Sequence, residues 1–367
     1  MDSLEVSAYT IPTATPESDG TLQWDATTLV VVELGGGGAR SLGYSYADAA
    51  TAHLIDSLLC GVVMGRDAMS IPATWSAMVG HIRNLGRPGI CSMAIAAVDN
   101  ALWDLKARVL NLCVADLAGL AHESIPAYGS GGFTSYTDEE LRRQLGGWAK
   151  DGLGAVKMKI GRAPEEDAQR VRVAREAIGW EVALYVDANG AYSRKQALEK
   201  AHQFADYNVT WFEEPVSSDD LEGLRLTRDQ GPPGMRIAAG EYAYDSHYFR
   251  RMLEAGAVDV LQADATRCAG VTGFLRAGAI AEAFSTPFSA HTAPSIHAHA
   301  ACATPRAINV EYFFDHARIE PMFFDGAIQP VDGELRPDRS RPGFGLELKR
   351  PDIEKYKVYG NNTSGKA

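Results

Sequence analysis

Ionisable side chains stand at the ends of seven consecutive short apolar segments between residues 155 and 311. They are Lys157 and Lys159, Asp187, Glu213, Glu241, Asp264, His291 and Glu311. Asp187, Glu213 and Glu241 follow three successive segments and offer only oxygen ligands, which suits Mg²⁺ better than zinc. Because converging carboxylates repel one another unless a cation neutralises them, the sequence predicts a Mg²⁺ site here. Glu214, beside Glu213, is expected to point away from the ion, although the sequence leaves open which of the two is the ligand.

Two further pairs of residues have the chemistry of proton transfer. Lys157 and Lys159 alternate within VKMKIG, so on a strand their ammonium groups share a face. Since each disfavours charging of the other, one is expected to be neutral near physiological pH and to act as a base. Asp264 and His291 end neighbouring segments, where a carboxylate can orient an imidazole and raise its basicity. The two pairs would place a base on each face of a substrate held by the metal ion.

The apolar segments that precede these residues have to bring them together. From about residue 125, short apolar segments alternate with longer helical ones, which is typical of βαβ units and a parallel sheet. Eight evenly spaced strands are predicted, over residues 125–128, 155–160, 183–186, 210–212, 236–239, 258–262, 286–289 and 308–310. Eight such repeats close a barrel that carries its active site at the C-terminal ends of the strands. A doubly wound sheet is the alternative, but the glycine-rich turn at 129–132 lacks the GxGxxG spacing of that fold.

The first 122 residues are predicted to form a separate α+β unit. β-branched residues over 27–34 and the segment 41–46 flank a glycine turn and predict a hairpin. Apolar residues at helical spacing predict a helix over 93–110. The chain is therefore expected to consist of an α+β capping domain (1–122), a barrel (123–325) and a C-terminal segment (326–367) that returns to the cap. Residues 361–367 are expected to be a disordered end.

The composition indicates a soluble globular protein and excludes disordered and fibrous classes, with 46% hydrophobic and 22% charged residues. The formal net charge of -12 disfavours binding to nucleic acid or to an anionic membrane, since either needs a basic face. Five cysteines without a CxxC pair argue against a disulfide framework and against a thiolate zinc site. Neither a signal peptide nor a membrane-spanning run is recognised, so a cytoplasmic protein is expected.

The ordered motifs VKMKIG, VDANGAYSRKQAL, WFEEP, AAGE, DATRCAGVTG and SAHTAP resemble the mandelate racemase subgroup of the enolase superfamily. The resemblance covers essentially the whole chain. It implies an α/β fold, a (β/α)7β modified TIM barrel with an N-terminal α+β capping domain. It also implies one essential Mg²⁺ held by Asp187, Glu213 and Glu241.

The same resemblance implies a role for each remaining residue of the series. Lys159 would be one base, with Lys157 as its electrostatic partner. His291, with Asp264, would be the second base or acid. Glu311 would donate a hydrogen bond to the substrate carboxylate.

The substrate is less well defined by the resemblance. Ser130 and Asn189 would line the substrate site, but residues 12–24 and 43–46, which stand where the family has its substrate loops, correspond only loosely. The polar character of 12–24 favours an acid sugar over an aryl substrate. Candidate contacts to the substrate are Glu17, Asp19, Arg83 and Arg87.

The implied reaction is removal of the proton next to a carboxylate through an enediolate intermediate. Mg²⁺, Lys157 and, if protonated, Glu311 would stabilise its negative charge. Dehydration of an aldonate or aldarate is predicted, with His291 as the acid that expels hydroxide. Racemisation or epimerisation of a 2-hydroxy acid is the alternative, and a catalytically silent metal-binding homologue is a third possibility. The expected partners are a small-molecule carboxylate substrate and further copies of the chain in a homo-oligomer, while the His297–His299 pair is expected to be structural.

Overall fold

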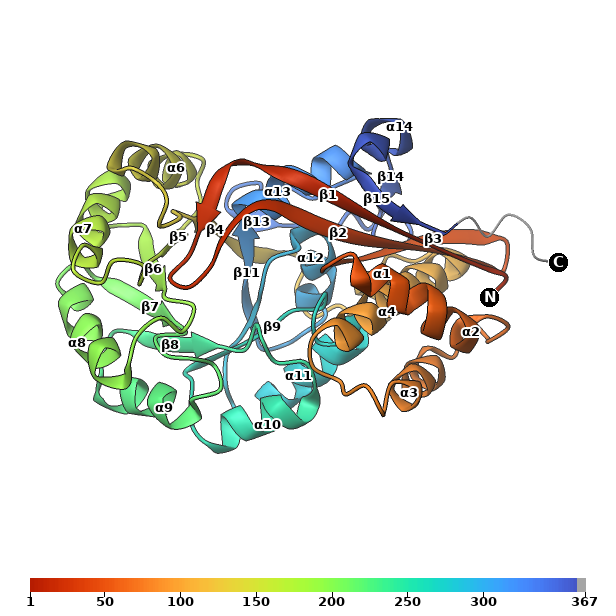
Figure 1. Ribbon diagram of the computed structural model, residues 1–367, viewed down its shortest axis with the longest axis horizontal. Helices are drawn as coiled ribbons and strands as arrows, with labels where there is room; N and C mark the ends of the chain where they lie inside the picture. The colour runs from red at the N-terminus through yellow and green to blue at the C-terminus, as the bar shows by residue number, and fades with distance from the viewer. Residues whose placement is uncertain (362–367) are drawn as a thin grey trace.

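The computed structural model describes residues 1–361, which form a barrel and a cap beside it (Figure 1). The predicted disordered end lies outside the described residues from 362 onward. Asn361 itself is ordered, because its backbone N–H donates to the Val6 carbonyl at 3.1 Å. Its side chain in turn accepts from the Val6 N–H at 2.8 Å. The prediction of disorder was therefore wrong for Asn361.

Eight parallel strands form the barrel, and the last pairs with the first to close it. They are β4 (Ile125–Gly131), β5 (Ala155–Lys159), β6 (Ala183–Asp187), β7 (Val209–Glu213), β8 (Arg236–Ala239), β9 (Val260–Ala263), β10 (Phe288–Ala290) and β11 (Ala307–Phe313). Every predicted strand overlaps one of these. β4 and β11 run further than predicted because they pair with each other up to Ser130 and Phe313.

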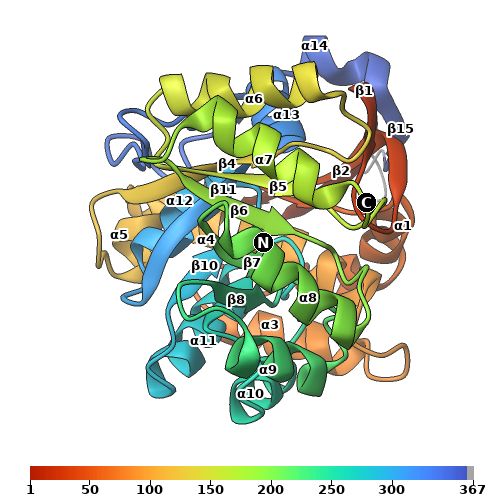
Figure 2. The same ribbon diagram turned by 90° about the vertical axis from the view of Figure 1, so that its left-hand side faces the viewer.

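Helices connect consecutive barrel strands and cover the outside of the sheet (Figure 2). They are α6 (Asp138–Lys150), α7 (Asp167–Ile178), α8 (Arg194–Ala205), α9 (Leu221–Gln230), α10 (Ser246–Glu254), α11 (Gly270–Ala283) and α12 (Pro294–Cys302), and α13 (Phe314–Phe323) follows β11. Sequence signals set some of their starts: α6 and α8 begin at capping boxes formed by Thr137 with Glu140 and by Ser193 with Gln196. The predicted (β/α)7β barrel is confirmed.

The cap is an antiparallel sheet with helices packed against it. Its strand order is β15 (Lys357–Gly360), β1 (Ser3–Ser18), β2 (Gln23–Gly36) and β3 (Ala39–Tyr46). The helical part comprises α1 (Ala50–Leu54), η1 (Ile55–Leu59), α2 (Cys60–Val63), α3 (Ile71–His81), α4 (Ile90–Leu110) and α5 (Val114–Ala118). The predicted hairpin and long helix are present, and an α+β cap is confirmed. In residues 1–361, no helix combines the length and the apolar character needed to cross a membrane.

The C-terminal part of the chain touches both units. β13 (Glu334–Leu335) pairs with β4 of the barrel, and β12 (Phe324–Asp325) pairs with β14 (Glu347–Leu348). After α14 (Arg350–Ile353) and η2 (Glu354–Tyr356), β15 pairs with β1 at the edge of the cap sheet. β15 thus lies at the edge of the cap sheet.

The expected substrate loop at residues 12–24 is not a loop. β1 and β2 form a long two-stranded ribbon that extends from the cap across the barrel (Figure 1). Pairing persists to Ser18 and Gln23, with an irregularity between Pro12 and Glu17. The polar and proline residues of the outer part of the ribbon do not predict strands. That part is a strand because the two chain segments pair with each other, and not because of local propensity. Only residues 19–22 form a turn, at the tip.

Candidate active site

The C-terminal ends of the barrel strands bring the predicted chemistry together. In the sheet register Lys159 is paired with Asp187, and Asp187 with Glu213. Lys157 lies on β5 with Lys159, and the other predicted catalytic and metal residues lie on or just after β8 to β11, all of them buried: Glu241, Asp264, His291 and Glu311. Strand ends of a parallel barrel meet at one face, which explains why residues up to 154 positions apart share one site.

Asp187, Glu213 and Glu241 form a buried cluster of carboxylates. Each offers one oxygen atom, and these atoms lie within 4.8 Å of one another. The donor set contains oxygen only, which fits Mg²⁺. Two lysine ammonium groups already lie against these carboxylates, so the pocket floor is built to hold positive charge.

The two lysines lie on one face, as the alternation along β5 predicts. Lys157 Nζ is 2.5 Å from Glu213 Oε1 and 2.7 Å from Glu311 Oε1, and Lys159 Nζ is 2.5 Å from Asp187 Oδ2. Burial alone would lower both lysine pKa values, but Glu213 and Glu311 raise the pKa of Lys157, and Asp187 raises that of Lys159. Without a metal ion the surrounding carboxylates favour the charged form of both lysines, and the neutral lysine expected for catalysis stays a prediction.

His291 is held by Asp264 on the other side of the cluster. The ring Nδ1 lies 2.8 Å from Asp264 Oδ2, and Nε2 lies 3.2 Å from Glu241 Oε2. Burial would raise the pKa of Asp264, yet the hydrogen bond with His291 holds it below its usual value. Asp264 is therefore a carboxylate that fixes the ring and directs Nε2 toward the carboxylate cluster.

Glu311 lies beside a lysine ammonium group, and its expected role as a donor stays a prediction. Burial favours its neutral form, but Lys157 and then His291 hold the pKa of Glu311 below its usual range. A carboxylate beside a lysine ammonium group accepts hydrogen bonds. Donation to a substrate thus requires that Lys157 first lose its charge or its contact with Glu311.

The two predicted substrate residues are placed differently. Asn189 lines the pocket in a left-handed conformation, with φ of 45°. Its N–H donates to Asp187 Oδ1 at 2.9 Å, and its own Oδ1 is buried without a hydrogen bond. Ser130 lies inside β4, fully buried, with its hydroxyl unpaired, and it is not among the residues that line the pocket.

Glu214 is buried next to the metal ligands but is not one of the clustered carboxylates. Its backbone is left-handed, with φ of 39°. Burial, with Glu241 next, raises the pKa of Glu214 strongly. The expectation that Glu213 and not its neighbour joins the cluster agrees with this geometry.

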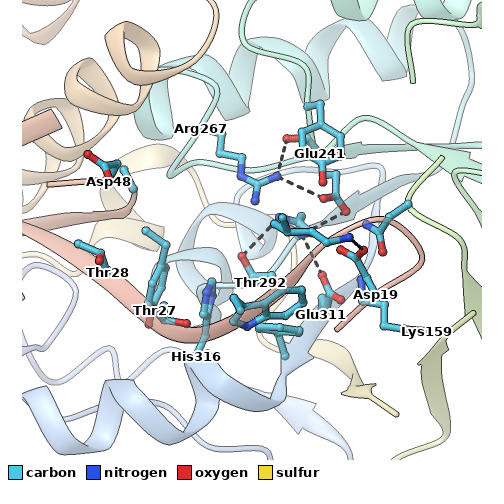
Figure 3. A pocket seen from close by; sticks show the side chains of 18 of the residues that line it. Asp19, Thr27, Thr28, Asp48, Lys159, Glu241, Arg267, Thr292, Glu311 and His316 are labelled. Carbon is cyan, nitrogen blue, oxygen red and sulfur yellow. Dashed lines mark hydrogen bonds and ion pairs between the residues drawn. The ribbon is translucent and has the colours of Figure 1, made fainter. Parts of the chain in front are cut away.

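A cavity of about 390 Å³ opens above these groups (Figure 3). Lys159, Asn189, Glu241, His291 and Glu311 contribute to its wall. Further lining residues come from the ribbon, the end of β3 and the barrel loops: Asp19, Leu22, Trp24, Thr27, Thr28, Tyr46, Asp48, Tyr242, Arg267, Thr292, Phe313 and His316. The cavity therefore has walls from both the cap and the barrel.

Several lining residues were not predicted. Arg267 Nη1 lies 3.2 Å from Glu241 Oε1, and its guanidinium lies 5.1 Å from the Tyr242 ring centre. The signal for Arg267 was present, since it stands three residues after Asp264 at the same strand end. Tyr46 lies in the segment 43–46 that stands where the family has a substrate loop, whereas His316 gave no signal, because only the packing of the cap on the barrel brings it to Tyr46.

Of the candidate substrate contacts, only Asp19 lines the cavity. Glu17 is fully buried in the ribbon and accepts a hydrogen bond from Trp24 Nε1 at 2.9 Å. Arg87 lies over the Trp75 ring, 5.3 Å from its centre. Arg83 and Arg87 both belong to the loop before α4, which does not reach the cavity. The predictions for Glu17, Arg83 and Arg87 were wrong because the positions of these residues depend on how the cap folds, and the sequence alone does not predict that.

His297 and His299 lie on α12 and do not line the cavity. His297 Nε2 accepts from the Ala265 N–H at 2.8 Å, and its Nδ1 lies 2.6 Å from the Thr292 carbonyl. Both ring nitrogens are thus engaged with the backbone of the loops that carry Asp264 and His291. The structural role expected for this pair agrees with the position of His297.

Known proteins resemble the chain over nearly its full length. A 3,6-anhydro-alpha-L-galactonate cycloisomerase of Streptomyces coelicolor is 32% identical, over 95% of this chain and 97% of its own. An arabinonate dehydratase of Saccharolobus solfataricus is 30% identical, over 88% of this chain and 87% of its own.

Solved structures give the same result for the fold. A mandelate racemase/muconate lactonizing enzyme-like protein from Rubrobacter xylanophilus has a TM-score of 0.95 and 56% identity, covering 97% of this chain and 99% of its own. A racemase from Streptomyces coelicolor A3(2), solved with bound magnesium, has a TM-score of 0.91 and 29% identity, covering 97% and 99%.

Two family models match in chain order. The N-terminal domain of mandelate racemase and muconate lactonizing enzyme matches residues 7–119, and the enolase C-terminal domain-like model matches residues 140–353. The chain belongs to the enolase superfamily, in its mandelate racemase subgroup.

Proposed function

We propose that the chain is a Mg²⁺-dependent acid-sugar dehydratase. It would remove the proton next to the carboxylate of an aldonate or aldarate and eliminate the β-hydroxyl as water. One observation carries this proposal: two proton-transfer groups lie against different members of one buried carboxylate cluster. Lys159 lies against Asp187 and His291 against Glu241, so a substrate bound at the cluster has a base on either side.

Asp187, Glu213 and Glu241 would hold the metal ion. When bound, Mg²⁺ supplies the positive charge that an enediolate needs as it forms. Carboxylates that bind the ion would stabilise the charged form of Lys159 less strongly, so Lys159 would lose its proton more easily. Lys157, next to Glu311, adds a fixed ammonium group close to the position of the substrate carboxylate.

The proton transfers follow from the positions of the side chains. Lys159 Nζ takes the α-proton, and its electron pair passes into the enediolate. The enediolate then expels the β-hydroxyl, and His291 Nε2 gives that oxygen the proton with which it leaves as water. Asp264 keeps the imidazole in place at Nδ1 and stabilises its charged form. The remaining enol tautomerises to a 2-keto-3-deoxy acid.

The names of the relatives support an acid sugar as substrate. The arabinonate dehydratase and the anhydro-galactonate cycloisomerase both act on sugar acids, and one solved relative carries magnesium. That same relative is named a racemase, which favours racemisation as the second candidate. The same two bases would serve it, with one removing the proton and the other returning it to the opposite face.

Proton NMR in D₂O separates the two candidates. The protein is incubated with Mg²⁺ and a panel of aldonates and aldarates, and loss of the α-proton signal is followed together with appearance of a 3-deoxy methylene signal. A dehydratase gives both, whereas a racemase gives exchange and a new epimer without elimination. Absence of exchange with every acid would overturn both candidates.

The two bases are tested with separate substitutions. Lys159→Ala and His291→Asn are both expected to abolish product formation, because each removes one of two obligatory proton transfers. If Lys159 removes the α-proton, His291→Asn retains α-proton exchange and Lys159→Ala does not. Full turnover in either variant would contradict the assignment of the bases.

A further inference from the structure

The part of the cavity beyond the carboxylate cluster is the feature that the proposed reaction does not use. Here called the tail site, it is lined by Thr27, Thr28, Tyr46 and the exposed Asp48 of the cap and by His316 of α13. Figure 3 shows Asp48 and Thr28 at the end of the cavity far from Lys159, and Asp19 near Lys159. A substrate whose carboxylate lies at the metal ligands has room for its remaining carbons in this space or toward the ribbon tip.

The acidic side chains in the lining outside the reaction centre are Asp48 and Asp19. Asp48 accepts a hydrogen bond from the Ala50 N–H through Oδ1, at 2.8 Å. Asp19 accepts from the N–H groups of Thr21 and Leu22, at 2.6 and 2.7 Å, also through Oδ1. Neither forms an ion pair within residues 1–361. A substrate tail therefore meets a carboxylate at the far end of the tail site and another at the ribbon tip.

The positively charged side chains of the cavity wall already contact carboxylates of the reaction centre. Within residues 1–361, Lys159 and Arg267 are the lysine and arginine side chains of the cavity wall. Lys159 contacts Asp187. Arg267 lies 3.2 Å from Glu241 Oε1 and 3.7 Å from Asp264 Oδ2, both of which belong to the reaction centre. The tail site thus has no uncommitted cation for a second carboxylate.

His316 and Tyr46 instead offer neutral hydrogen-bond donors. Their rings stack with centres 3.3 Å apart. The Ala293 N–H donates to His316 Nδ1 at 3.3 Å, so the neutral ring carries its hydrogen on Nε2, and burial, then His291, lower the pKa of His316. The Tyr46 hydroxyl is buried with no hydrogen-bond partner among the described residues. A buried donor without a partner, such as the Tyr46 hydroxyl, favours a ligand that supplies an acceptor.

We infer that the tail site selects sugar acids with one carboxylate and a neutral, hydroxylated tail, and that His316 Nε2–H donates to a hydroxyl of that tail. This inference rests on the proposed function and narrows it from aldonates and aldarates to aldonates. Hydroxyl groups can accept from His316 and Tyr46 and can donate to Asp48. A second carboxylate can accept only, and it would lie near Asp48 or Asp19 without a counter-ion. Selectivity of this kind comes from repulsion of the wrong ligand as much as from contacts to the right one.

Matched pairs of acids test the inference directly. Each pair consists of an aldonate and the aldarate of the same configuration, such as D-galactonate and galactarate, which differ at the terminal carbon alone. For pairs in which either acid reacts, kcat/KM is expected to favour the aldonate by about tenfold or more, the effect of roughly 1.4 kcal/mol of repulsion. Equal or greater kcat/KM for the aldarates would overturn the inference while the proposed dehydratase activity stood. If neither class reacts, the proposed function falls and this inference with it.

Substitutions locate the source of the selectivity. Asp48→Asn keeps the oxygen that caps the Ala50 N–H and removes the charge, so the preference for aldonates should shrink by about threefold or more. Asp19→Asn serves as the second variant in case the tail points to the ribbon tip. Asp206→Asn is the matched control, since Asp206 is exposed at the C-terminus of α8, away from the cavity. An unchanged preference in both Asp48→Asn and Asp19→Asn would contradict the repulsion.

The donor role of His316 is tested by a separate pair of variants. His316→Phe keeps a ring to stack on Tyr46 and removes Nε2–H, so KM for the aldonate should rise by about tenfold with a smaller change in kcat. His316→Gln returns an N–H donor and should recover part of that loss. Equal KM in the wild type and in His316→Phe would overturn the assignment of the donor.

Discussion

At the residue scale, two adjacent glutamates are both buried but differ in backbone conformation, and only one of them belongs to the carboxylate cluster. Glu213 ends β7 in the strand and joins the carboxylate cluster, whereas Glu214 has a left-handed backbone and does not. We expect Glu213→Gln to weaken Mg²⁺ binding by about 100-fold or more, because a charged ligand of a hard cation is lost. Glu214→Gln, the matched control, should change the affinity by less than about threefold, since Glu214 lies outside the cluster of carboxylates.

Isothermal titration calorimetry with MgCl₂ measures both affinities. If Glu214→Gln loses Mg²⁺ binding and Glu213→Gln keeps it, Glu214 is the metal ligand and Glu213 is not. Equal loss in both variants would indicate that the two carboxylates bind the ion together.

The reaction centre was predictable because it depends on strand ends. Each of its residues lies at the end of a recognisable apolar segment, and in a parallel barrel the C-terminal ends of the strands meet at one face. The charge state of the Lys157–Lys159 pair stays a prediction, because it depends on the carboxylates around the pair and on the metal ion. Tyr46 lies in the segment 43–46 that stands where the family has a substrate loop, but its stacking on His316 depends on how the cap sits on the barrel.

At the element scale, the β1–β2 ribbon connects the cap to the barrel loops. Its tip is Gly20, where a Cβ atom would lie 2.5 Å from the Ala188 carbonyl oxygen and 2.7 Å from the Ile160 carbonyl oxygen. Both carbonyls belong to backbone that follows barrel strands of the active site, so neither can move freely. The Ser18 hydroxyl also lies 2.6 Å from the Thr134 hydroxyl, which ties the ribbon to the loop after β4.

Gly20→Ala should therefore move the tip of the ribbon away from the Ala188 and Ile160 carbonyls and lower kcat/KM by about tenfold, while the rest of the fold persists. Gly147→Ala is the control, because Gly147 lies within α6 with no atom within 4 Å of the added Cβ. Alanine there favours the helix. Steady-state kinetics and far-UV circular dichroism compare the two variants, and wild-type kinetics in Gly20→Ala would show that the seating of the tip does not matter for turnover.

The ribbon also contains a buried acid. Burial, with Asp315 next, raises the pKa of Glu17 to about 8, while Trp24 Nε1 donates to its Oε2 and Oε1 has no partner. The folded chain thus keeps a proton that the unfolded chain, with an ordinary pKa of 4.5, releases. This contribution to stability is complete below pH 4.5, falls by about 1.4 kcal/mol per pH unit above it, and is lost once the pH passes about 8.

Glu17→Gln should remove this part of the pH dependence, since the amide does not titrate and its oxygen can still accept from Trp24. Urea unfolding of both proteins between pH 5.5 and 8.5 gives the comparison, and the difference in free energy of unfolding should grow in favour of the variant as the pH rises. A constant difference across that range would mean that Glu17 is ionised in the folded chain.

Strand and helix positions in the barrel were largely predictable, and the ribbon was not. Barrel strands are buried on both faces and therefore read as apolar segments. The outer half of β1, from Pro12 to Ser18, carries polar residues and two prolines, and it is a strand only because β2 pairs with it. Long-range pairing of this kind leaves little trace in local composition.

At the scale of the whole molecule, the cap and the barrel are joined by polar contacts as well as by packing. Asp99 of α4 accepts from the N–H of Thr272 in α11 at 2.9 Å, and the Tyr44 hydroxyl of β3 donates to Glu320 of α13 at 2.6 Å. Trp75 Nε1 donates to the Ala269 carbonyl at 2.8 Å. Because these contacts are buried, separating the two units would leave polar groups unpaired on both sides.

We therefore expect Mg²⁺ to stabilise the cap as well as the barrel, although its predicted ligands all lie in the barrel. An ion that binds only the folded state adds about 2.7 kcal/mol at 100 times its dissociation constant, and a cooperative unit shares that gain. Differential scanning calorimetry with increasing MgCl₂ should show one transition that moves upward, and it should stay in place in Asp187→Asn. Limited proteolysis gives a second readout, because Mg²⁺ should slow cleavage within α3 and α4 of the cap as much as cleavage within the barrel. A cap that is cleaved at the same rate with and without Mg²⁺, while the barrel becomes protected, would mean that the buried contacts through Asp99, Tyr44 and Trp75 do not couple the two units.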